Sequence, residues 1–552
     1  MRHRPLIRLL VLASLLVVAT LVTLRTNRDV LPPPAAPETP APLPPEAREA
    51  DAVAPAPPPV SSRDQRDFLL AEKLLARLNE TFAQEQGRLN EAVLTFKDAD
   101  AYRRFLARAA ECGFKVLGRL DRFHTVRVRY DSLDSLTGDL ANFSGDYSDL
   151  DANYFVYPPD VPEPEARYAG QFAPIGNGLL DFLGVTGDTS KWGAGVTIAV
   201  LDSGIVADPT FGTNRLRFVD IGLGIAPEGD NGHGTAVASL AGGMASDAIG
   251  IAPGANLLSI RVTGMDGLSD SFSLSQGILA AVDAGAQIIN VSMGSYANSF
   301  VMTHAIDYAA SRGVLVVASA GNDQVGQLTW PAANPYVISV GAVDAAEQQV
   351  FFSNSGEELK IAAPGYGLQS AWLNGQRVFI DGTSGSAPVV AGSIAAMMSQ
   401  NPGITASQAW GILRTHASDG GVLGPDPNFG NGIVNLGWAM NRNDFGRIDT
   451  AVSSQFFDAS RSEMQFIVQN RSAPHVGGLV LEVDAGIARK KFTVPQLGPG
   501  ATYAVRVPVD YSTLQFLGRI DYRTTLVNPA GIIDVLPANN QRANRITLIA
   551  PQ

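Results

Sequence analysis

Short continuous apolar runs recur through the middle of the chain, between residues 158 and 442. They are VTIAVLD, NLLSIRV, AQIINVSM, GVLVVASA and YVISVGAV, and segments rich in alanine and glycine separate them. Runs of this length without polar alternation are typical of strands buried on both faces, as in a parallel sheet covered by helices. The pattern therefore predicts a doubly wound parallel α/β domain over residues 158–442.

A different pattern precedes this block, over residues 90–157. The segments AVLTF, FKVLGRL, HTVRVRY and ANYFVY have the composition of strands, and DADAYRRFLARAAE and DSLDSLTGDLANF have that of helices. The order is β-α-β-β-α-β, the split βαβ arrangement of a small α+β, ferredoxin-like domain. Such an order implies no function by itself.

The segment from 446 to 552 changes character again. Its predicted strands, EMQFIVQN, GLVLEVDAG, KKFTVP, TYAVRVPV and RIDYRTTLV, are separated by turn sequences such as QLGPGA and NPAG. Short strands joined by such turns predict a β-sandwich. The pattern resembles the CARDB or fibronectin-like modules appended to exported proteins. A stabilising or spacing role is the simplest interpretation, and binding of a partner or a glycan is the alternative.

The N-terminus carries an export signal. Arg2, Arg4 and Arg8 precede an apolar run at residues 9–24. Positive charge before such a run keeps the N-terminus in the cytoplasm and sends the following chain outside. The run fits either an uncleaved membrane anchor, which we favour, or a cleaved signal peptide that would give a secreted protein.

Two further segments lie between this signal and the first domain. Residues 31–60 contain twelve prolines, which exclude a helix or a packed strand and predict an extended stalk. After it, Phe68, Leu75, Leu78 and Phe82 recur on one face of an amphipathic helix. The predicted segments are 1–30 (signal anchor or signal peptide), 31–60 (stalk), 61–89 (amphipathic helix), 90–157 (small α+β domain), 158–442 (α/β domain) and 446–552 (β-sandwich).

Composition excludes several classes of function. The formal net charge of -12 and the pI near 5.0 argue against a nucleic-acid-binding protein, which presents a concentrated basic face. The single cysteine, Cys112, excludes an internal disulfide and a cysteine-rich zinc site.

Four polar residues stand where predicted strands end or helices begin. Asp202 closes VTIAVLD, His233 opens the helix of NGHGTAVASL, Asn322 follows GVLVVASA, and Ser384 opens the helix of DGTSGSAPVVAG. In open α/β sheets the functional site lies beyond the carboxyl ends of the strands. These residues supply a nucleophile, a base, an orienting carboxylate and oxyanion donors, which are the requirements of acyl transfer.

The α/β block resembles the subtilisin family of serine proteases over roughly 280 residues. The resemblance rests on DSG at Asp202, GHGT at His233, AGN at Asn322 and GTSGSAP at Ser384, in the family's order. It implies a serine endopeptidase with a catalytic triad of Asp202, His233 and Ser384, acting through an acyl-enzyme. The oxyanion hole would be the side chain of Asn322 and the backbone N–H of Ser384.

Two alternatives stay open at this point. An α/β-hydrolase esterase would place serine before the acid and the histidine, with His416 or His475 as base, and would carry a Gly-x-Ser-x-Gly elbow. Residues 382–386 are GTSGS and lack the last glycine. The other alternative is an inactive subtilisin-like scaffold that binds without cutting, which the filled catalytic positions disfavour.

The resemblance also implies how substrates bind. A protein or peptide substrate would enter as an extra strand between residues 264–267 and 292–294. The predicted substrate-binding residues are Gly264, Met265, Gly267, Leu268, Ser292, Met293 and Gly294. Met293 and Leu268 would line an apolar pocket. The sequence shows no acidic cluster beside this cleft, and Asp266 lies in a loop, where acidic residues are common. We therefore expect apolar or mixed substrates.

Further expectations concern cofactors and processing. Catalysis by such a triad requires no cofactor, no metal site is assigned, and structural calcium is left open. Residues 90–157 resemble the family's propeptide, which implies a self-processing zymogen cut within residues 157–172. Two departures from the family pattern are Ala236, expected to change only packing, and Gly385, expected to remove a side chain that packs behind the nucleophile.

Overall fold

A computed structural model of the chain describes residues 86–158, 160, 170–226, 228, 231–486 and 488–547, together with Ala76. The predicted export signal, the stalk and nearly all of the predicted amphipathic helix lie outside these ranges. Among the described residues, no helix is both long and apolar enough to cross a membrane. The export and anchoring of the chain therefore stay predictions.

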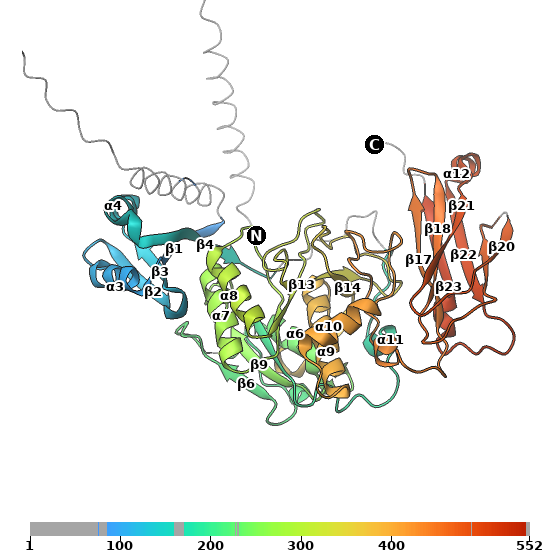
Figure 1. The fold of residues 1–552 in the computed structure, drawn as a ribbon, viewed down its shortest axis with the longest axis horizontal. Coiled ribbons are helices and arrows are strands. Elements are labelled where there is room, and N and C mark those ends of the chain that lie inside the picture. The colour runs from blue at the N-terminus through green and yellow to red at the C-terminus, as the bar shows by residue number, and fades with distance from the viewer. Residues whose placement is uncertain are drawn as a thin grey trace, which may run out of the picture. The chain divides into compact units, whose positions relative to one another are not determined.

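The first described domain is a four-stranded antiparallel sheet covered by two helices (Figure 1). Its elements are β1 (Gly87–Phe96), α3 (Ala99–Arg108), β2 (Phe114–Leu120), β3 (Thr125–Tyr130), α4 (Leu133–Phe143) and β4 (Tyr147–Val156). This is the predicted β-α-β-β-α-β order. Asp98 and Ser132 cap the two helices through their side-chain oxygens. Phe105 and Leu136, both fully buried, pack the helices onto the sheet.

β1 begins three residues earlier than the predicted domain boundary at residue 90. Residues 87–89 were assigned to the amphipathic helix, and the structure places them in the strand. Asn90, with a φ of 56°, lies where the register between β1 and β4 shifts, so Gly87 pairs with Tyr154 ahead of the regular ladder. Such an irregularity breaks the apolar alternation that marks a strand in the sequence.

The central domain is built on a seven-stranded sheet whose neighbouring strands are all parallel. In spatial order the strands are β14 (Ile361–Pro364), β13 (Val337–Val343), β12 (Leu315–Ser319), β11 (Ile288–Val291), β5 (Thr197–Asp202), β9 (Asn256–Arg261) and β6 (Leu216–Val219). All five predicted apolar runs form strands of this sheet. The predicted doubly wound α/β architecture is confirmed.

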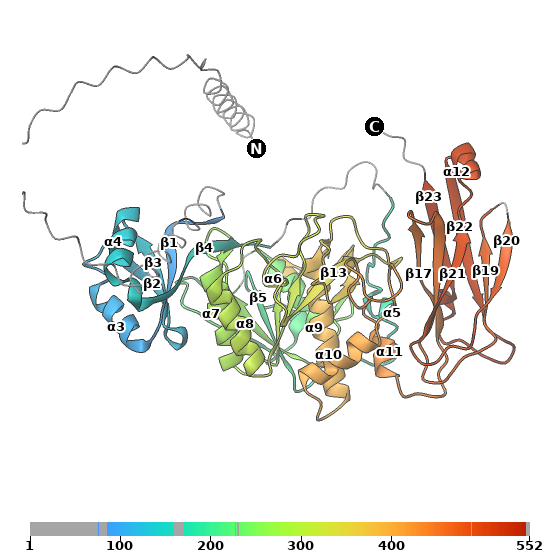
Figure 2. The ribbon, with the colours of Figure 1, turned by 45° about the horizontal axis from the view of Figure 1, so that its top comes forward.

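Helices cover both faces of this sheet (Figures 1 and 2). The long helices are α6 (His233–Gly242), α7 (Ser271–Asp283), α8 (Phe300–Ser311), α9 (Thr383–Gln400) and α10 (Ala406–Thr415), and two short ones are α5 (Leu179–Phe182) and α11 (Leu436–Met440). In β5, Ile198 and Val200 pack with α6, α9 and α10, whereas Ala199 and Leu201 pack with α7 and α8. A strand buried on both faces explains why its sequence shows no polar alternation.

Short strands complete this domain near the site. They are β7 (Met244–Ala245), β8 (Ala248–Ile249), β10 (Ser269–Asp270), β15 (Leu368–Ala371) and β16 (Arg377–Ile380). The first two pair with each other, as do the last two, while β10 pairs with β4 of the first domain. A five-stranded antiparallel sheet therefore includes one strand of the central domain.

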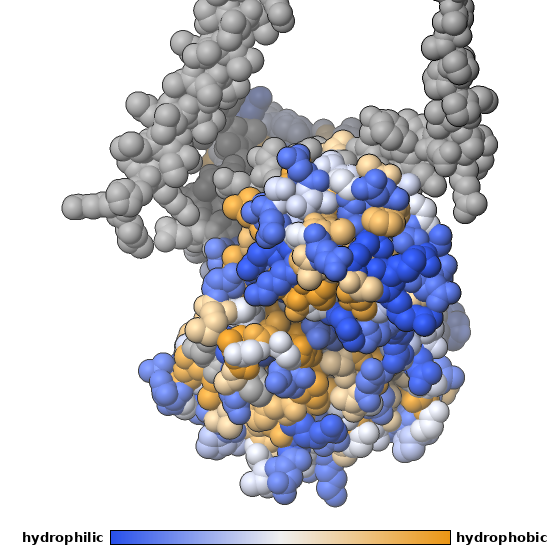
Figure 3. All heavy atoms as spheres, turned by 90° about the vertical axis from the view of Figure 1, so that its left-hand side faces the viewer, coloured by the Kyte–Doolittle hydropathy of each residue, from blue (hydrophilic) through white to orange (hydrophobic). Residues whose placement is uncertain are grey.

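The C-terminal domain consists of two antiparallel sheets packed over one core. One contains β17 (Thr450–Asp458), β18 (Glu463–Asn470) and β21 (Thr502–Pro508), and the other contains β20 (Arg489–Thr493), β19 (Val480–Asp484), β22 (Arg519–Val527) and β23 (Gln541–Thr547). A short helix, α12 (Tyr511–Leu517), joins β21 to β22. β22 alternates exposed and buried residues without a break, as a strand between a core and solvent should. Figure 3 views the molecule from the left-hand side of Figure 1, where the first described domain lies, and hydrophilic and apolar residues are interspersed over that face.

Candidate active site

The fold brings the four predicted site residues to the carboxyl edge of the parallel sheet. Asp202 is the last residue of β5, and His233 is the first residue of α6. Asn322 follows the end of β12 by three residues, and Ser384 is the second residue of α9. Helix starts and strand ends meet at this edge because each crossover returns the chain to the same side of the sheet.

Asp202 and His233 form a buried hydrogen-bonded pair. The Nδ1 atom of His233 lies 2.8 Å from Oδ1 of Asp202, whose side chain is fully buried. Oδ1 also accepts hydrogen bonds from the backbone N–H of Ser203 at 2.7 Å and from its hydroxyl at 3.2 Å. Burial opposes protonation of His233, but the charge of Asp202 and the hydrogen bond to it outweigh that effect and raise the pKa of the imidazole.

Ser203 and Asn231 fix this pair from behind, and the sequence argument did not single them out. The Ser203 hydroxyl donates to Oδ1 of Asn231 at 2.6 Å, and the same oxygen accepts the backbone N–H of His233 at 3.0 Å. The backbone N–H of Gly234 donates to the Ser203 hydroxyl oxygen at 3.2 Å. Their positions in the sequence could have indicated this role, because Ser203 directly follows Asp202 and Asn231 lies two residues before His233.

Ser384 lies at the start of α9 and is almost fully buried, with 3% of its surface exposed. Its hydroxyl donates to the backbone oxygen of Ser292 at 3.2 Å, and the Ser292 hydroxyl donates to the backbone oxygen of Ser384 at 2.9 Å. Gly382, two residues before Ser384, has a φ of 124°, a backbone conformation that residues other than glycine rarely adopt. The sharp entry into α9 therefore depends on glycine.

Asn322 is held beside this helix start. Its Oδ1 atom accepts the backbone N–H and the hydroxyl of Thr383, both at 2.9 Å. The side chain is fully buried. These two hydrogen bonds fix the plane of the amide one residue before the nucleophile candidate.

The expectation for Gly385 was wrong. A Cβ atom at this position would lie 2.8 Å from Cδ1 of Leu368 and 3.5 Å from Cδ1 of Ile380. The space behind Ser384 is therefore already filled by β15 and β16, and no missing side chain leaves a gap. Ala236 is fully buried, in line with a packing role.

A strand of the first domain enters the predicted substrate cleft. Phe155 and Val156 of β4 pair antiparallel with Asp270 and Ser269 of β10. Beyond them, the N–H and C=O of Tyr157 pair with Gly294 at 3.2 and 3.0 Å. The cleft thus accepts an extended chain as an added strand.

The two predicted substrate-binding segments differ in their behaviour. Gly294 pairs with the entering strand as expected, but residues 264–268 close a turn, in which the N–H of Gly264 donates to Leu268 at 2.8 Å. The pairing on that side falls instead on Ser269 and Asp270, which directly follow the turn. Met265 is 84% exposed at the tip of this turn.

An apolar cluster lies under the entering strand. Val156 is fully buried in it with Val262, Leu274 and Met293. Met293 therefore packs with Val156 in this cluster, whereas Leu268 is partly exposed, and their role in an apolar substrate pocket stays a prediction.

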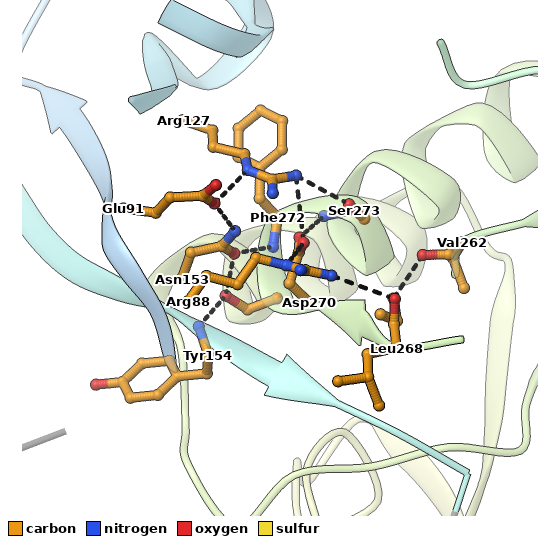
Figure 4. A network of polar contacts seen from close by, with 12 residues as sticks. Arg88, Glu91, Arg127, Asn153, Tyr154, Val262, Leu268, Asp270, Phe272 and Ser273 are labelled. Carbon is orange, nitrogen blue, oxygen red and sulfur yellow. Dashed lines mark hydrogen bonds and ion pairs between the residues drawn. The ribbon is translucent and has the colours of Figure 1, made fainter. Parts of the chain in front are cut away.

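Polar contacts join the same strand to the starts of two helices, and Figure 4 shows the contact at the start of α7. The side-chain oxygen of Asn153 accepts the backbone N–H of Phe272 in α7 at 3.2 Å. A carboxylate oxygen of Asp151 accepts the backbone N–H of Phe300 in α8 at 2.8 Å. Each contact satisfies an N–H group that the first turn of a helix leaves without an intrahelical partner.

A buried glutamate supports this network. Oε2 of Glu91 accepts from Nε of Arg127 at 2.8 Å and from Nδ2 of Asn153 at 3.0 Å, and Oε1 accepts from Arg129 at 2.9 Å. Burial opposes ionisation of Glu91, but these donors outweigh it and lower the pKa of the carboxyl group.

Metal ligation was left open by the sequence. Within the described parts of the chain, no group of three or more histidine, cysteine, aspartate or glutamate side chains is arranged to hold a metal ion.

Comparisons with known proteins agree with this geometry. Residues 193–432 match the model of the subtilase family. The chain is 35% identical over 245 residues to subtilisin Savinase from Lederbergia lenta, an alignment that covers 44% of this chain and 90% of the relative. The chain belongs to the subtilase family. It is therefore a serine protease of the subtilisin family, which acts on protein or peptide substrates.

Other relatives of this subtilase extend the picture. Subtilisin DY from Bacillus licheniformis is 32% identical over 254 residues, covering 44% of this chain and 90% of the relative. Among solved structures, the epidermin leader peptide processing serine protease from Staphylococcus aureus superposes with a TM-score of 0.52 at 20% identity, covering 64% of this chain and 97% of that one. At this identity the superposition shows a shared fold.

Proposed function

We propose that this subtilase is an exported endopeptidase that cleaves peptide bonds with Asp202, His233 and Ser384. The hydrogen bond between Asp202 and His233 is the observation that carries the proposal, because it holds the imidazole with Nδ1 engaged and Nε2 left to act as base. The proposed reaction requires the Ser384 hydroxyl to turn away from Ser292 and to give its proton to Nε2. The pKa raised by Asp202 favours the imidazolium that this transfer produces.

The reaction would proceed in two stages. Ser384 Oγ bonds to the substrate carbonyl carbon while His233 takes the hydroxyl proton, and the resulting oxyanion is stabilised by the amide of Asn322 and the backbone N–H of Ser384. His233 then protonates the leaving amine, and the C–N bond breaks. A water molecule then attacks the acyl-enzyme carbonyl while His233 takes its proton, and His233 returns that proton to Ser384 Oγ as the ester bond breaks and the acid product leaves.

The domain at residues 87–156 is proposed to be a propeptide that the protease removes itself. β4 occupies the cleft, and the antiparallel pairing of Tyr157 with Gly294 directs the following chain toward Ser292. The backbone oxygen of Ser292 accepts the Ser384 hydroxyl hydrogen bond, so that direction leads to the nucleophile. A cut within residues 157–172 follows from this path.

Processing and catalysis are tested together with Ser384→Ala. Wild-type protein is expected as two fragments that bind a fluorophosphonate probe and digest denatured casein. The variant is expected as one chain near 58.2 kDa without labelling or activity. Equal processing in both proteins would assign the cut to another protease, and a folded wild type that neither labels nor digests would favour the inactive scaffold.

Membrane attachment is the remaining part of the proposal. It is supported by the arginine-flanked apolar run at residues 9–24 and the proline-rich stalk. Full-length protein should stay in the membrane pellet on carbonate extraction, with the catalytic domain accessible to added protease in spheroplasts. A soluble product that begins between residues 25 and 40 would show signal cleavage instead.

A further inference from the structure

A guanidinium group from the N-terminal domain fills a set of three oxygen acceptors beside the cleft, and Figure 4 shows two of them, on Leu268 and Asp270. Arg88 donates from Nη1 to Oδ2 of Asp266 at 2.9 Å, from Nη2 to the backbone oxygen of Leu268 at 3.3 Å, and from Nε to Oδ2 of Asp270 at 2.7 Å. We call these three residues the guanidinium cradle. Three acceptors around one planar group match the fixed fork of arginine better than the compact ammonium of lysine.

Both cationic partners of the buried member of the cradle come from the N-terminal domain. Asp270 pairs with Arg88 and also with Arg127, whose Nη1 atom lies 3.2 Å from Oδ2 of Asp270. The side chain is 2% exposed, and Oδ1 caps α7 by accepting the N–H of Ser273 at 2.8 Å. When the N-terminal domain departs, this carboxylate keeps its helix cap and loses both positive charges. A partly buried carboxylate without a counter-charge favours binding of a new cation.

The cradle lies where a substrate side chain can reach it. Asp270 directly opposes Phe155 in the antiparallel pairing of β10 with β4. Directly opposed residues have Cβ atoms about 4.5–5.5 Å apart on one face of the sheet. The guanidinium carbon of Arg88 lies 5.3 Å from the centre of the Phe155 ring, so the two groups share that face.

We propose that the processed enzyme uses Asp266, Leu268 and Asp270 to bind an arginine side chain of its substrate, at the position that Phe155 occupies in β4. This position lies two residues before the one that pairs with Gly294. The inference rests on the proposed zymogen function, because Arg88 vacates the cradle only when the N-terminal domain leaves. It replaces the expectation of apolar or mixed substrates, which treated Asp266 as an ordinary loop acid.

Peptides built on the chain's own sequence test the specificity. Internally quenched peptides of residues 151–172 carrying arginine, lysine, glutamine or phenylalanine at position 155 are compared by kcat/KM on the self-processed enzyme at low salt. Arginine should exceed glutamine by about 10-fold, as expected for charge-assisted hydrogen bonds, and lysine should fall between them. The Ki of each peptide is measured as inhibition of casein hydrolysis. It reports how tightly the peptide binds even if the peptides are cut at different bonds.

Variants of the cradle supply the decisive comparison. Asp270→Asn keeps an oxygen to cap α7 and removes the charge, so kcat/KM for the arginine peptide should fall to about that for the glutamine peptide. Asp266→Asn should reduce the preference. Asp283→Asn is the matched control, because Asp283 also pairs with an N-terminal-domain arginine, Arg122 at 3.3 Å, but from the other end of α7.

The outcomes separate this inference from the proposed function. An arginine preference that survives in Asp270→Asn, or equal values of kcat/KM and Ki for the arginine and glutamine peptides, would overturn the cradle assignment even if casein is digested. A preference lost equally in Asp283→Asn would also overturn it. Failure of the wild type to digest casein or bind the fluorophosphonate would instead overturn the proposed function.

Discussion

Replacing Val156 by alanine should weaken the hold of the N-terminal domain on the cleft. Val156 is fully buried among Val262, Leu274 and Met293. The change removes two buried methyl groups, each worth about 0.8 kcal/mol, and leaves a small cavity whose cost brings the total to about 2 kcal/mol. Because about 1.4 kcal/mol is a factor of ten, the dissociation constant of the cut N-terminal domain should rise about 30-fold.

Progress curves of casein hydrolysis measure this effect. After dilution of the self-processed protein, wild type should show a lag while the N-terminal domain dissociates, and Val156→Ala should show a much shorter one with the same final rate. Leu89→Ala is the control, since Leu89 lies in the same domain and is 75% exposed. An unchanged lag in Val156→Ala, or an equal shortening in Leu89→Ala, would refute the assignment of Val156 as an anchor in the cleft.

Three further changes test the site. Asn322→Ala should lower kcat about 100- to 1000-fold with little change in KM, measured on a fluorogenic peptide, because the oxyanion is formed only after substrate binds. Since the base must be neutral and Asp202 raises the pKa of His233 above its ordinary value of 6.5, kcat/KM should rise with pH through a midpoint above 6.5; a midpoint below 6.5 would contradict this direction. Gly385→Ala should lower stability by about 1 kcal/mol, because its Cβ would lie 2.8 Å from Leu368 and overpacking exceeds the gain in helix propensity; thermal unfolding in the Ser384→Ala background measures it.

The sequence predicted the parallel sheet well for a physical reason. Strands buried on both faces must be apolar throughout, so β5, β9, β11, β12 and β13 appear as unbroken apolar runs. β14 and β6 were not predicted, since they are edge strands of four residues each. In the C-terminal domain, β17 and β23 were not predicted. Both lie at a sheet edge, and the sequence of β23, QRANRIT, is largely polar.

The candidate site was predictable in part. Asp202, His233, Asn322 and Ser384 each occupy a strand end or a helix start, which is a local feature that a sequence motif can show. The contacts of Arg88 with Asp266 and Asp270 span 178 and 182 residues, and no local pattern indicates them. The fit around Gly385 depends on Leu368 and Ile380 of a neighbouring hairpin. The sequence of the helix alone therefore could not show whether a side chain at position 385 would raise or lower stability.

The N-terminal domain contacts the protease through two kinds of interaction that serve different ends. Strand pairing at Asp270 and Gly294, together with burial of Val156, copies what an extended peptide would do, and in the proposed zymogen these contacts would block the cleft. Asn153 and Asp151 instead satisfy the starts of α7 and α8, which no extended substrate in the cleft would do. Only the second kind of contact satisfies helix starts, and helices rest on local contacts that can form ahead of the slow, non-local pairing of a parallel sheet. A domain with both kinds of contact is suited to assist folding first and to block the cleft afterwards.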